Sequence, residues 1–465
     1  MFGVLKNSSS KLTPLSVRCF TTGQTSLAIA AARKSFNKKA SFDRSKHNRK
    51  GQGSEKTFVE TLKSSNFKTT AKDAEILEKL PTLTVQNLRL GEVVRYNDEN
   101  LRKMFVSGSF KAHQFNELYS KPTTLIRPTE TVKLADFYSN SIKEEHSRNN
   151  RLILTGPTGV GKSTALSQFQ AMALGTSGGA ILIAVPNAES IVDGSSDFKY
   201  NNDTGLYDQQ MLARTLLRKL IAANKDLLSE IKISADFVPV HGGKKQQETQ
   251  KLTKGKSSVL DLALLGVGQQ INSTHVFTTI VQELSTQTTY PVFITLDNLS
   301  AFVQFGMTAY RDTHNDPIYF QKLQIAKTLL DYLSGESTFA KGAIVAATRG
   351  SDKHSENDTI PVGLGLKDPN LYKKFDNFDR NFAEVLAKNG GAKNLEVSKL
   401  SVDECRALLA HMISCDVIHN EYQMAEELES LGQEEYLRKL AERKYLISGN
   451  GNARLFLESC VLAYV

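Results

Sequence analysis

The fold of this chain is decided by residues 151–164, which read Arg-Leu-Ile-Leu-Thr-Gly-Pro-Thr-Gly-Val-Gly-Lys-Ser-Thr. The apolar run 152–154 is typical of a buried parallel strand, and residues 156–163 match the phosphate-loop pattern GxxxxGK[ST] without departure. Glycines let the backbone curl around phosphate oxygens, while the amide groups that open the next helix point positive dipoles inward. The sequence therefore predicts a nucleotide-binding site between a strand and a helix.

The side chains of this loop have distinct expected roles. Lys162 is expected to reach the β- and γ-phosphates, Ser163 to supply a hydroxyl to magnesium, and Thr164 to begin the helix beside the α-phosphate. The predicted nucleotide-binding residues of the loop are Gly156, Pro157, Thr158, Gly159, Val160, Gly161, Lys162, Ser163 and Thr164.

Magnesium needs a second oxygen ligand, and Asp297 is the candidate because it directly follows the apolar run 291–296. The next residue is Asn298. Hydrolytic relatives of this architecture commonly carry Glu there to activate water, and an amide cannot accept that proton. We therefore expect nucleotide hydrolysis to be slow or absent.

Two further residues are candidates for phosphate contacts. Thr348 follows the apolar run 342–347 and is placed to read the γ-phosphate, although a simple strand cap fits as well. Arg454 lies in the stretch 449–455, Gly-Asn-Gly-Asn-Ala-Arg-Leu, which resembles the second sensor motif of AAA+ proteins. A surface arginine after a glycine turn is the alternative.

The rest of the chain alternates strand-like and helix-like segments. Apolar runs at 151–154, 180–185, 291–296 and 342–347 are separated by helical patterns such as 209–221 and 319–333. This alternation predicts an α/β fold with a doubly wound parallel sheet. The phosphate loop indicates the P-loop NTPase class, and the resemblance of residues 449–455 to a sensor motif implies the AAA+ type. Beyond Asp368 we find no comparable β run and expect a C-terminal α-helical domain.

The N-terminal region has a different composition. Among residues 1–50 there are eleven Lys or Arg against one acid, Asp43, and the chain as a whole has a net charge of +9. The acid-free, Ser/Thr-rich start is typical of a mitochondrial transit peptide, with Arg18 two positions before an expected cut after Phe20. A disordered basic tail is the alternative. We find no apolar run long enough to span a membrane and expect no membrane insertion.

These patterns divide the chain into four predicted segments. We expect a transit peptide at 1–20, a basic and largely extended segment at 21–85, a P-loop NTPase domain at 86–367 and a helical lid domain at 368–465. A polar stretch at 242–258 is expected to be a surface loop, with a contact to RNA as the alternative.

Several stretches of the sequence together resemble the death-associated protein three family. They are the phosphate loop, the stretches 180–188 and 191–194, the segment 207–210 leading to Asn224, and the closing Gly-Asn-Ala-Arg at 451–454. That family is the GTP-binding, AAA+-like component of the small subunit of the mitochondrial ribosome. The resemblance implies GTP or GDP at residues 156–164, with Asp297 and Arg454 as further ligands. The sequence contains no NKxD motif, which usually pairs with guanine, so ATP is the alternative ligand.

Two classes of function follow from this resemblance. In the first, the protein is a structural component of the mitochondrial ribosome in the matrix, bound to small-subunit rRNA and ribosomal proteins, holding a nucleotide and magnesium with little or no hydrolysis. Such a component is not expected to be a homo-oligomer. In the second, it is a free matrix ATPase of the AAA+ type, a remodelling or loader enzyme. Asn298 favours the first class.

Overall fold

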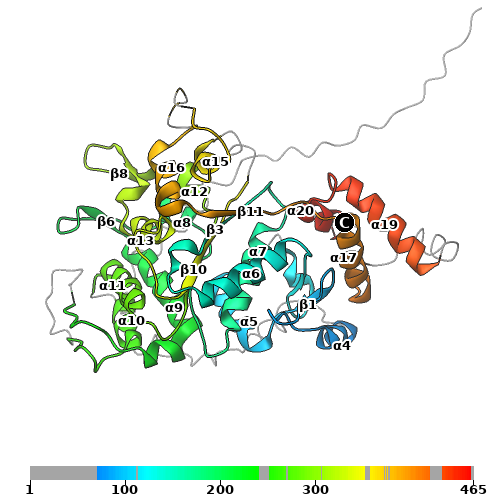
Figure 1. Cartoon of the computed structure of the whole chain (residues 1–465), viewed down its shortest axis with the longest axis horizontal. Coiled ribbons are helices and arrows are strands. Elements are labelled where there is room, and N and C mark those ends of the chain that lie inside the picture. The colour runs from blue at the N-terminus through cyan, green and yellow to red at the C-terminus, as the bar shows by residue number, and fades with distance from the viewer. Residues whose placement is uncertain are drawn as a thin grey trace, which may run out of the picture. The chain divides into compact units, whose positions relative to one another are not determined.

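A parallel β-sheet forms the centre of the computed structural model (Figure 1). The structure describes residues 71–461 except 112–113, 240–250, 269–270, 305, 351–356, 371, 373, 375–376 and 419–431. The strands of the sheet are β3 (Arg151–Thr155), β4 (Ile181–Val185), β7 (Val292–Asp297), β10 (Gly342–Ala347) and β11 (Lys393–Glu396). They lie in the order β11-β3-β10-β7-β4, and every neighbouring pair is parallel. The predicted α/β sheet is confirmed.

The register of the sheet brings the predicted site residues to one edge. Ala347 of β10 is paired with Asp297 of β7 on one side and with Leu154 of β3 on the other. Because all strands run the same way, Asp297 stands at the level where β3 passes into the phosphate loop. The carboxyl edge of a doubly wound sheet is the usual place for a ligand.

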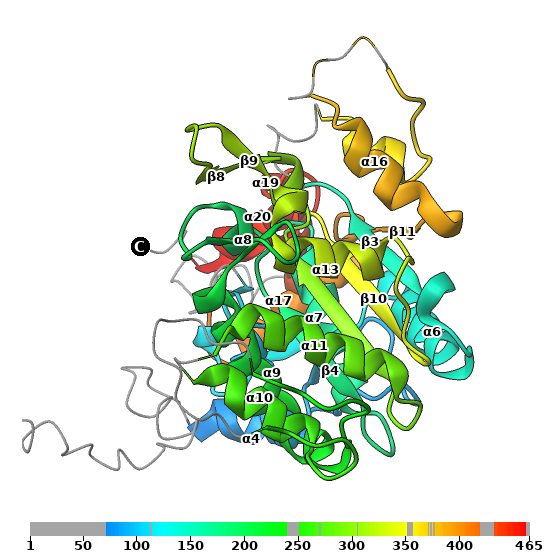
Figure 2. The same cartoon turned by 90° about the vertical axis from the view of Figure 1, so that its left-hand side faces the viewer.

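Helices cover both faces of the sheet because successive strand residues point to opposite sides. Ile153 and Ile344 belong to one buried cluster, whereas Leu152, Leu154 and Val345 belong to another. The first cluster is completed by α9 (Gln210–Glu230), α10 (Val259–Val267), α11 (Ser273–Thr286), α13 (Gln324–Leu333) and α16 (Arg380–Ala387). The second is completed by α5 (Asp98–Ser107), α6 (Glu130–Lys143) and α7 (Lys162–Leu174), and Figure 2 shows α6 apart from α10 and α11.

Shorter elements surround this core. Three antiparallel pairs are formed by β1 (Val93–Arg95) with β2 (Thr123–Leu125), β5 (Lys199–Asn201) with β6 (Leu206–Asp208), and β8 (Met307–Arg311) with β9 (Pro317–Tyr319). The short helices in the described part of the chain are α4 (Ala71–Lys79), η2 (Asn116–Leu118), η3 (Ser147–Asn149), α8 (Glu189–Val192), α12 (Ala301–Gln304), η4 (Phe320–Lys322), α15 (Thr359–Gly363) and η5 (Lys388–Gly390). The helix expected at 319–333 begins only at Gln324, because Tyr319 belongs to β9, which pairs with β8, and Phe320–Lys322 form the 3-10 helix η4.

Three C-terminal helices form a third buried cluster. They are α17 (Val402–Ser414), α19 (Gln433–Ile447) and α20 (Ala453–Val461), and their core includes Leu409, Leu440 and Phe456. The cluster also contains Val93 of β1 and Leu125 of β2, so these helices pack against the antiparallel β1–β2 pair that precedes α6. We call α17, α19 and α20 the lid.

The expectation of an α-helical domain over 368–465 needs a correction, because β11 adds an edge strand to the main sheet at 393–396. In this strand only Leu395 is buried, so it lacks the apolar run that marked the other strands. The sheet therefore continues past the predicted boundary at 367/368, and the lid as defined here begins after β11.

Several sequence predictions concern residues outside the described part of the chain. These are the transit peptide at 1–20, residues 21–70 of the basic extension, and residues 242–250 of the polar stretch. Among the described residues, no helix has both the length and the apolar character that a bilayer crossing requires.

A buried histidine at the contact between α17 and the β1–β2 pair predicts acid sensitivity. His411 stacks on Tyr119 with ring centroids 5.1 Å apart, its Nε2 lies 3.3 Å from Thr123 Oγ1, and Cys415 and Asp73 also face it. Burial lowers the pKa of His411 from 6.5 to about 4, and the nearby Asp73 opposes this shift.

The unfolded chain therefore takes up a proton at His411 at a higher pH than the folded protein does. As the pH is lowered from about 6.5 to about 4, we expect the protonation of His411 to reduce the free energy of unfolding by about 1.4 kcal/mol for each pH unit. Urea unfolding of the wild type and of His411→Phe, which keeps the ring stack without a titrating group, measures this contribution. Identical pH dependence in both proteins would contradict it.

Candidate nucleotide site

The phosphate loop joins the end of β3 to the start of α7, and glycines shape it. Gly156 has φ of 131° and Gly159 has φ of 82°, a region that strains any side chain. A Cβ at Gly156 would lie 2.5 Å from the carbonyl oxygen of Val397, and one at Gly159 would lie 2.5 Å from Asn452 Oδ1. The loop is therefore packed between the end of β11 and the lid.

Lys162 is buried at the first turn of α7, with 5% of its surface exposed. Its Nζ donates to the carbonyl oxygens of Gly156 at 2.8 Å and Pro157 at 2.5 Å, so the ammonium stands inside the curve of the loop. Burial lowers the pKa of Lys162 to about 8, and the charge of Asp297 acts in the opposite direction. A phosphate group beside this ammonium would relieve part of the cost of burying it.

Asp297 is buried at the end of β7. Its Oδ1 accepts a hydrogen bond from the backbone amide of Asn298 at 2.8 Å, and its Oδ2 lies 3.4 Å from the Nζ of Lys111. A carboxylate together with the hydroxyl of Ser163 is the oxygen donor set that magnesium prefers, so these residues fit the expected metal.

Asn298 occupies a left-handed position with φ of 62° and turns its side chain toward the loop after β4. Its Nδ2 donates to Asn187 Oδ1 at 2.9 Å and to Glu189 Oε2 at 3.3 Å, while its Oδ1 is buried and has no hydrogen-bond partner among the residues that the structure describes. Glu189 also lies 3.8 Å from Arg349 Nη1. The side-chain amide of Asn298 therefore lies beside the carboxylate of Glu189, which the sequence pattern did not reveal.

Thr348 caps the sheet in this structure. Its Oγ1 donates to the carbonyl oxygen of Leu154 at 3.1 Å, across the β3–β10 pair. Two residues later the chain touches the loop, because Thr158 Oγ1 donates to the carbonyl oxygen of Gly350. The hydroxyl of Thr348 is therefore hydrogen-bonded to the neighbouring strand, which is the arrangement expected of a simple strand cap.

Arg454 contacts the loop through its backbone. Its amide donates to the carbonyl oxygen of Gly159 at 2.8 Å, whereas its guanidinium pairs with Glu458 on the same helix at 2.8 Å. Asn452 makes the closer side-chain contact, because its Nδ2 donates to the carbonyl oxygen of Thr158 at 2.7 Å. The start of α20 is therefore attached to the phosphate loop, with the arginine side chain held by Glu458.

A buried arginine links the lid to the body of the protein. Arg127 follows β2, and its Nε lies 3.1 Å from Glu404 Oε1 of α17 while its Nη2 lies 3.2 Å from Glu130 Oε1 of α6. The guanidinium also donates to the carbonyl oxygens of Ser398 and Lys399 at 3.0 Å each. Arg127 and these partners therefore surround the connection from β11 to α17. Ser398 is the residue after Val397, whose carbonyl oxygen faces the phosphate loop.

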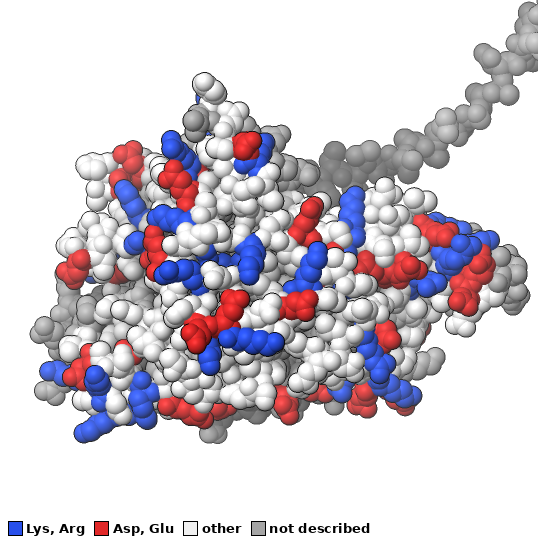
Figure 3. Space-filling view, in the orientation of Figure 1, with Lys and Arg blue, Asp and Glu red and all other residues white. Residues whose placement is uncertain are grey.

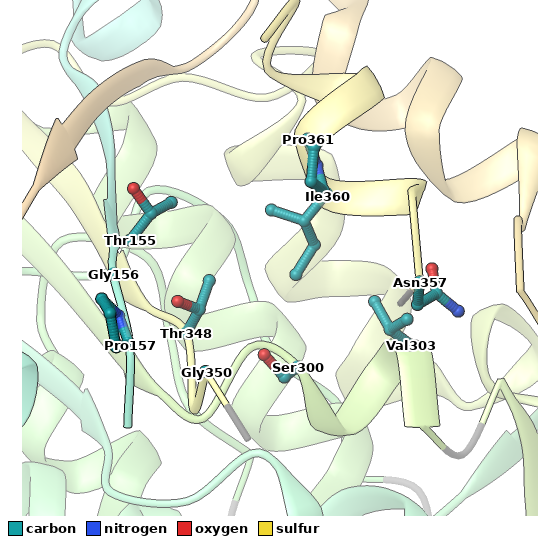
Figure 4. A pocket seen from close by; sticks show the side chains of 10 residues that line it. All are labelled: Thr155, Gly156, Pro157, Ser300, Val303, Thr348, Gly350, Asn357, Ile360 and Pro361. Carbon is teal, nitrogen blue, oxygen red and sulfur yellow. The ribbon is translucent and has the colours of Figure 1, made fainter. Parts of the chain in front are cut away.

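A cavity of about 310 Å³ opens beside the start of the loop. In Figure 4 the Ile360 side chain extends from α15 into this space, toward Ser300. The lining residues are Thr155, Gly156, Pro157, Ser300, Val303, Thr348, Gly350, Asn357, Ile360 and Pro361. The candidate site therefore continues from the loop along the carboxyl edge of the sheet.

A family model described as mitochondrial ribosomal death-associated protein 3 matches residues 124–459. The chain belongs to this family. The small ribosomal subunit protein mS29 of Schizosaccharomyces pombe is 23% identical over 378 residues, which cover 80% of this chain and 71% of that protein. The family match thus spans the sheet, the phosphate loop and most of the lid.

Solved structures with some similarity include Cdc6p from Pyrobaculum aerophilum and a Walker-type ATPase of Pyrococcus abyssi. The first has a TM-score of 0.31 and 12% identity, covering 71% of this chain and 60% of that one. The second has a TM-score of 0.32 and 14% identity, covering 72% and 71%. The fold assignment rests on the strand order and the phosphate loop described above.

Proposed function

We propose that this protein is a structural component of the small subunit of the mitochondrial ribosome and holds a purine nucleotide at residues 156–164. The family match over residues 124–459 carries the ribosomal role. GTP or GDP is the proposed ligand, from the family resemblance, with ATP as the alternative. The intact loop between β3 and α7 supports nucleotide binding because its glycines, amides and lysine are all present in the required order.

In this proposal each part of the site has a binding task. The loop amides and the start of α7 bind the phosphate oxygens, and Lys162 supplies a positive charge opposite the β- and γ-phosphates. Ser163 and Asp297 would hold magnesium, which neutralises charge on those phosphates when it is bound. We include Thr348 and Arg454 as outer contacts, reached only if their side chains leave Leu154 and Glu458.

We infer that the nucleotide stabilises the protein and is turned over little. Asn298 offers an amide where a carboxylate would take a proton from water. The second candidate function, a free matrix AAA+ ATPase, is favoured by one observation: Glu189 places a carboxylate 3.3 Å from the Asn298 amide. The glutamate is itself held by Asn298 and Arg349, which leaves it less available as a base.

The ribosomal partners are proposed to be small-subunit rRNA and ribosomal proteins. On the face shown in Figure 3, Lys and Arg alternate with Asp and Glu and form no single basic patch. The concentrated positive charge of the chain instead lies in residues 21–50, which keep eight Lys or Arg after removal of a transit peptide at 1–20. We propose that this segment contacts phosphates of the rRNA in the matrix.

Sedimentation tests the ribosomal role. In a gradient of mitochondrial lysate the protein should move with the small subunit as a single copy, and deleting residues 21–51 should weaken this association and reduce its dependence on salt. Denaturing the protein from that fraction and separating the released nucleotide by chromatography identifies the base.

A free ATPase would differ both in its sedimentation and in its rate of nucleotide turnover. It would stay near the top of the gradient at low salt and would turn over nucleotide at about 1 per second or faster, as ordinary enzymes do. Turnover that disappears in Glu189→Gln would assign the base to that carboxylate and replace the structural role by the enzymatic one.

A further inference from the structure

The segment that follows α5 runs directly beside the phosphate site. Gly108 takes a left-handed φ of 77°, and a Cβ there would lie 2.7 Å from the Cβ of Pro186, the residue after β4. Ser109 is held against α7 because Ser167 Oγ donates to its carbonyl oxygen at 2.6 Å. These contacts place residues 108–111 along the first turns of the helix that carries Lys162.

From this segment Lys111 extends to the predicted magnesium ligand. Its Nζ lies 3.4 Å from Asp297 Oδ2 and donates to the carbonyl oxygen of Pro186. The other carboxylate oxygen of Asp297 accepts from the backbone amide of Asn298. Both oxygens therefore have partners within this chain, and one of those partners is a cation.

Positive charge gathers on this side of the site. Lys162 lies inside the phosphate loop, and Lys111 pairs with Asp297. The half-buried Lys219 of α9 lies close to Gly108, because its Nζ is 3.6 Å from the position that a Cβ on Gly108 would occupy. Burial lowers the pKa of Lys219, and the charge of Lys111 lowers it further. Partly buried cations interact strongly with an anion because water screens them little. A polyphosphate is the ligand that this arrangement favours.

We propose that Lys111 is an intrinsic cation of the nucleotide site, which neutralises Asp297 and the terminal phosphate together, so that the chain retains its nucleotide when magnesium is removed. This inference rests on the nucleotide binding proposed above. A lysine ammonium is a compact point charge that binds phosphate without the octahedral ligand geometry that magnesium demands. Lys111 is also anchored to Pro186, so it stands beside Asp297 before a ligand arrives.

The test compares GDP binding by the full chain in excess magnesium and in excess EDTA, measured by calorimetry, with ADP as a parallel probe. The wild type should lose no more than about tenfold in affinity when EDTA replaces magnesium. Lys111→Met should lose a further ten- to hundredfold, roughly, in EDTA and much less in magnesium, which is the effect expected for one charge-assisted hydrogen bond.

Two controls separate this role from a structural ion pair. Lys121→Met removes a partly exposed lysine that pairs with Asp98 at 3.0 Å, and should leave both affinities unchanged. Asp297→Asn releases Lys111 from its carboxylate, and should raise GDP affinity in EDTA above that of the wild type. Circular dichroism confirms that each variant is folded.

The outcomes distinguish the two proposals. A wild type that binds GDP in magnesium but loses more than about a hundredfold in EDTA, or a Lys111→Met variant weakened equally in both conditions, overturns the role of Lys111 and leaves nucleotide binding intact. A folded wild type that binds neither GDP nor ADP in either condition overturns nucleotide binding itself, and the role of Lys111 with it.

Discussion

Replacing Lys162 by alanine is expected to remove most of the stabilisation of this protein by nucleotide. A ligand that binds only the folded state adds about 2.7 kcal/mol at a concentration a hundred times its Kd. Lys162 is the cation inside the loop, and losing its charged hydrogen bonds to phosphate should raise the Kd about a hundredfold. Thermal unfolding with and without GDP and magnesium measures the difference.

The ligand-free variant gives the clearer signature. Burial lowers the pKa of Lys162, so the charged side chain costs free energy when no phosphate is present. Lys162→Ala should therefore unfold at a similar or higher temperature than the wild type without nucleotide, and at a lower temperature with it. Lys327→Ala, which removes an exposed lysine paired with Asp331 at 3.6 Å, should respond to nucleotide as the wild type does. A full nucleotide shift in Lys162→Ala would exclude the loop as the binding site.

The parts of the fold that the sequence predicted are those with a strong local pattern. Strands β3, β4, β7 and β10 are buried along their whole length or nearly so, and each therefore appears as a run of apolar residues. The phosphate loop is contiguous and its glycines are required by positive φ, so a short motif is enough to find it. The position of Asp297 followed from the rule that ligands gather at the carboxyl edge of a parallel sheet.

The parts that the sequence did not predict depend on distant neighbours. Strand β11 is an edge strand with one buried residue, and only its pairing with β3 defines it. Lys111 meets Pro186 across 75 residues of sequence, and Arg127 meets Glu404 across 277. Lysine and arginine are common, so no local signal marks these two among the others in the chain.

The contacts around the loop indicate how a bound nucleotide would stabilise this fold. The loop touches Val397 just after β11, Asn452 and the backbone of Arg454 at the start of α20, and Gly350 in the segment after β10. Segments from the middle and from the end of the sequence thus meet at one short turn. A ligand that orders this turn would stabilise all of these contacts, which agrees with a structural use of the nucleotide and does not require hydrolysis.

Arg127→Met is expected to destabilise the protein by about 3 to 5 kcal/mol, the usual cost of breaking a buried ion pair by removing one partner. The variant would leave the buried carboxylates of Glu130 and Glu404 without their cation. It would also remove the donors for the carbonyl oxygens of Ser398 and Lys399, which hold the connection to the lid. Urea unfolding measures the change, and faster proteolysis within the lid should accompany it.

The triple variant Arg127→Met, Glu130→Gln, Glu404→Gln decides whether the cost comes from the charges. Neutral amides lose the ionic part of the desolvation penalty, so the triple variant should recover part of the stability that the single variant lost. Arg380→Met is the matched control, because Arg380 pairs with Glu384 at 2.9 Å on an exposed helix face and should change stability by no more than about 0.5 kcal/mol. If Arg127→Met is as mild as this control, the lid is held by its apolar contacts with β1 and β2 and its hydrogen bonds to the phosphate loop, and not by the Arg127 ion pairs.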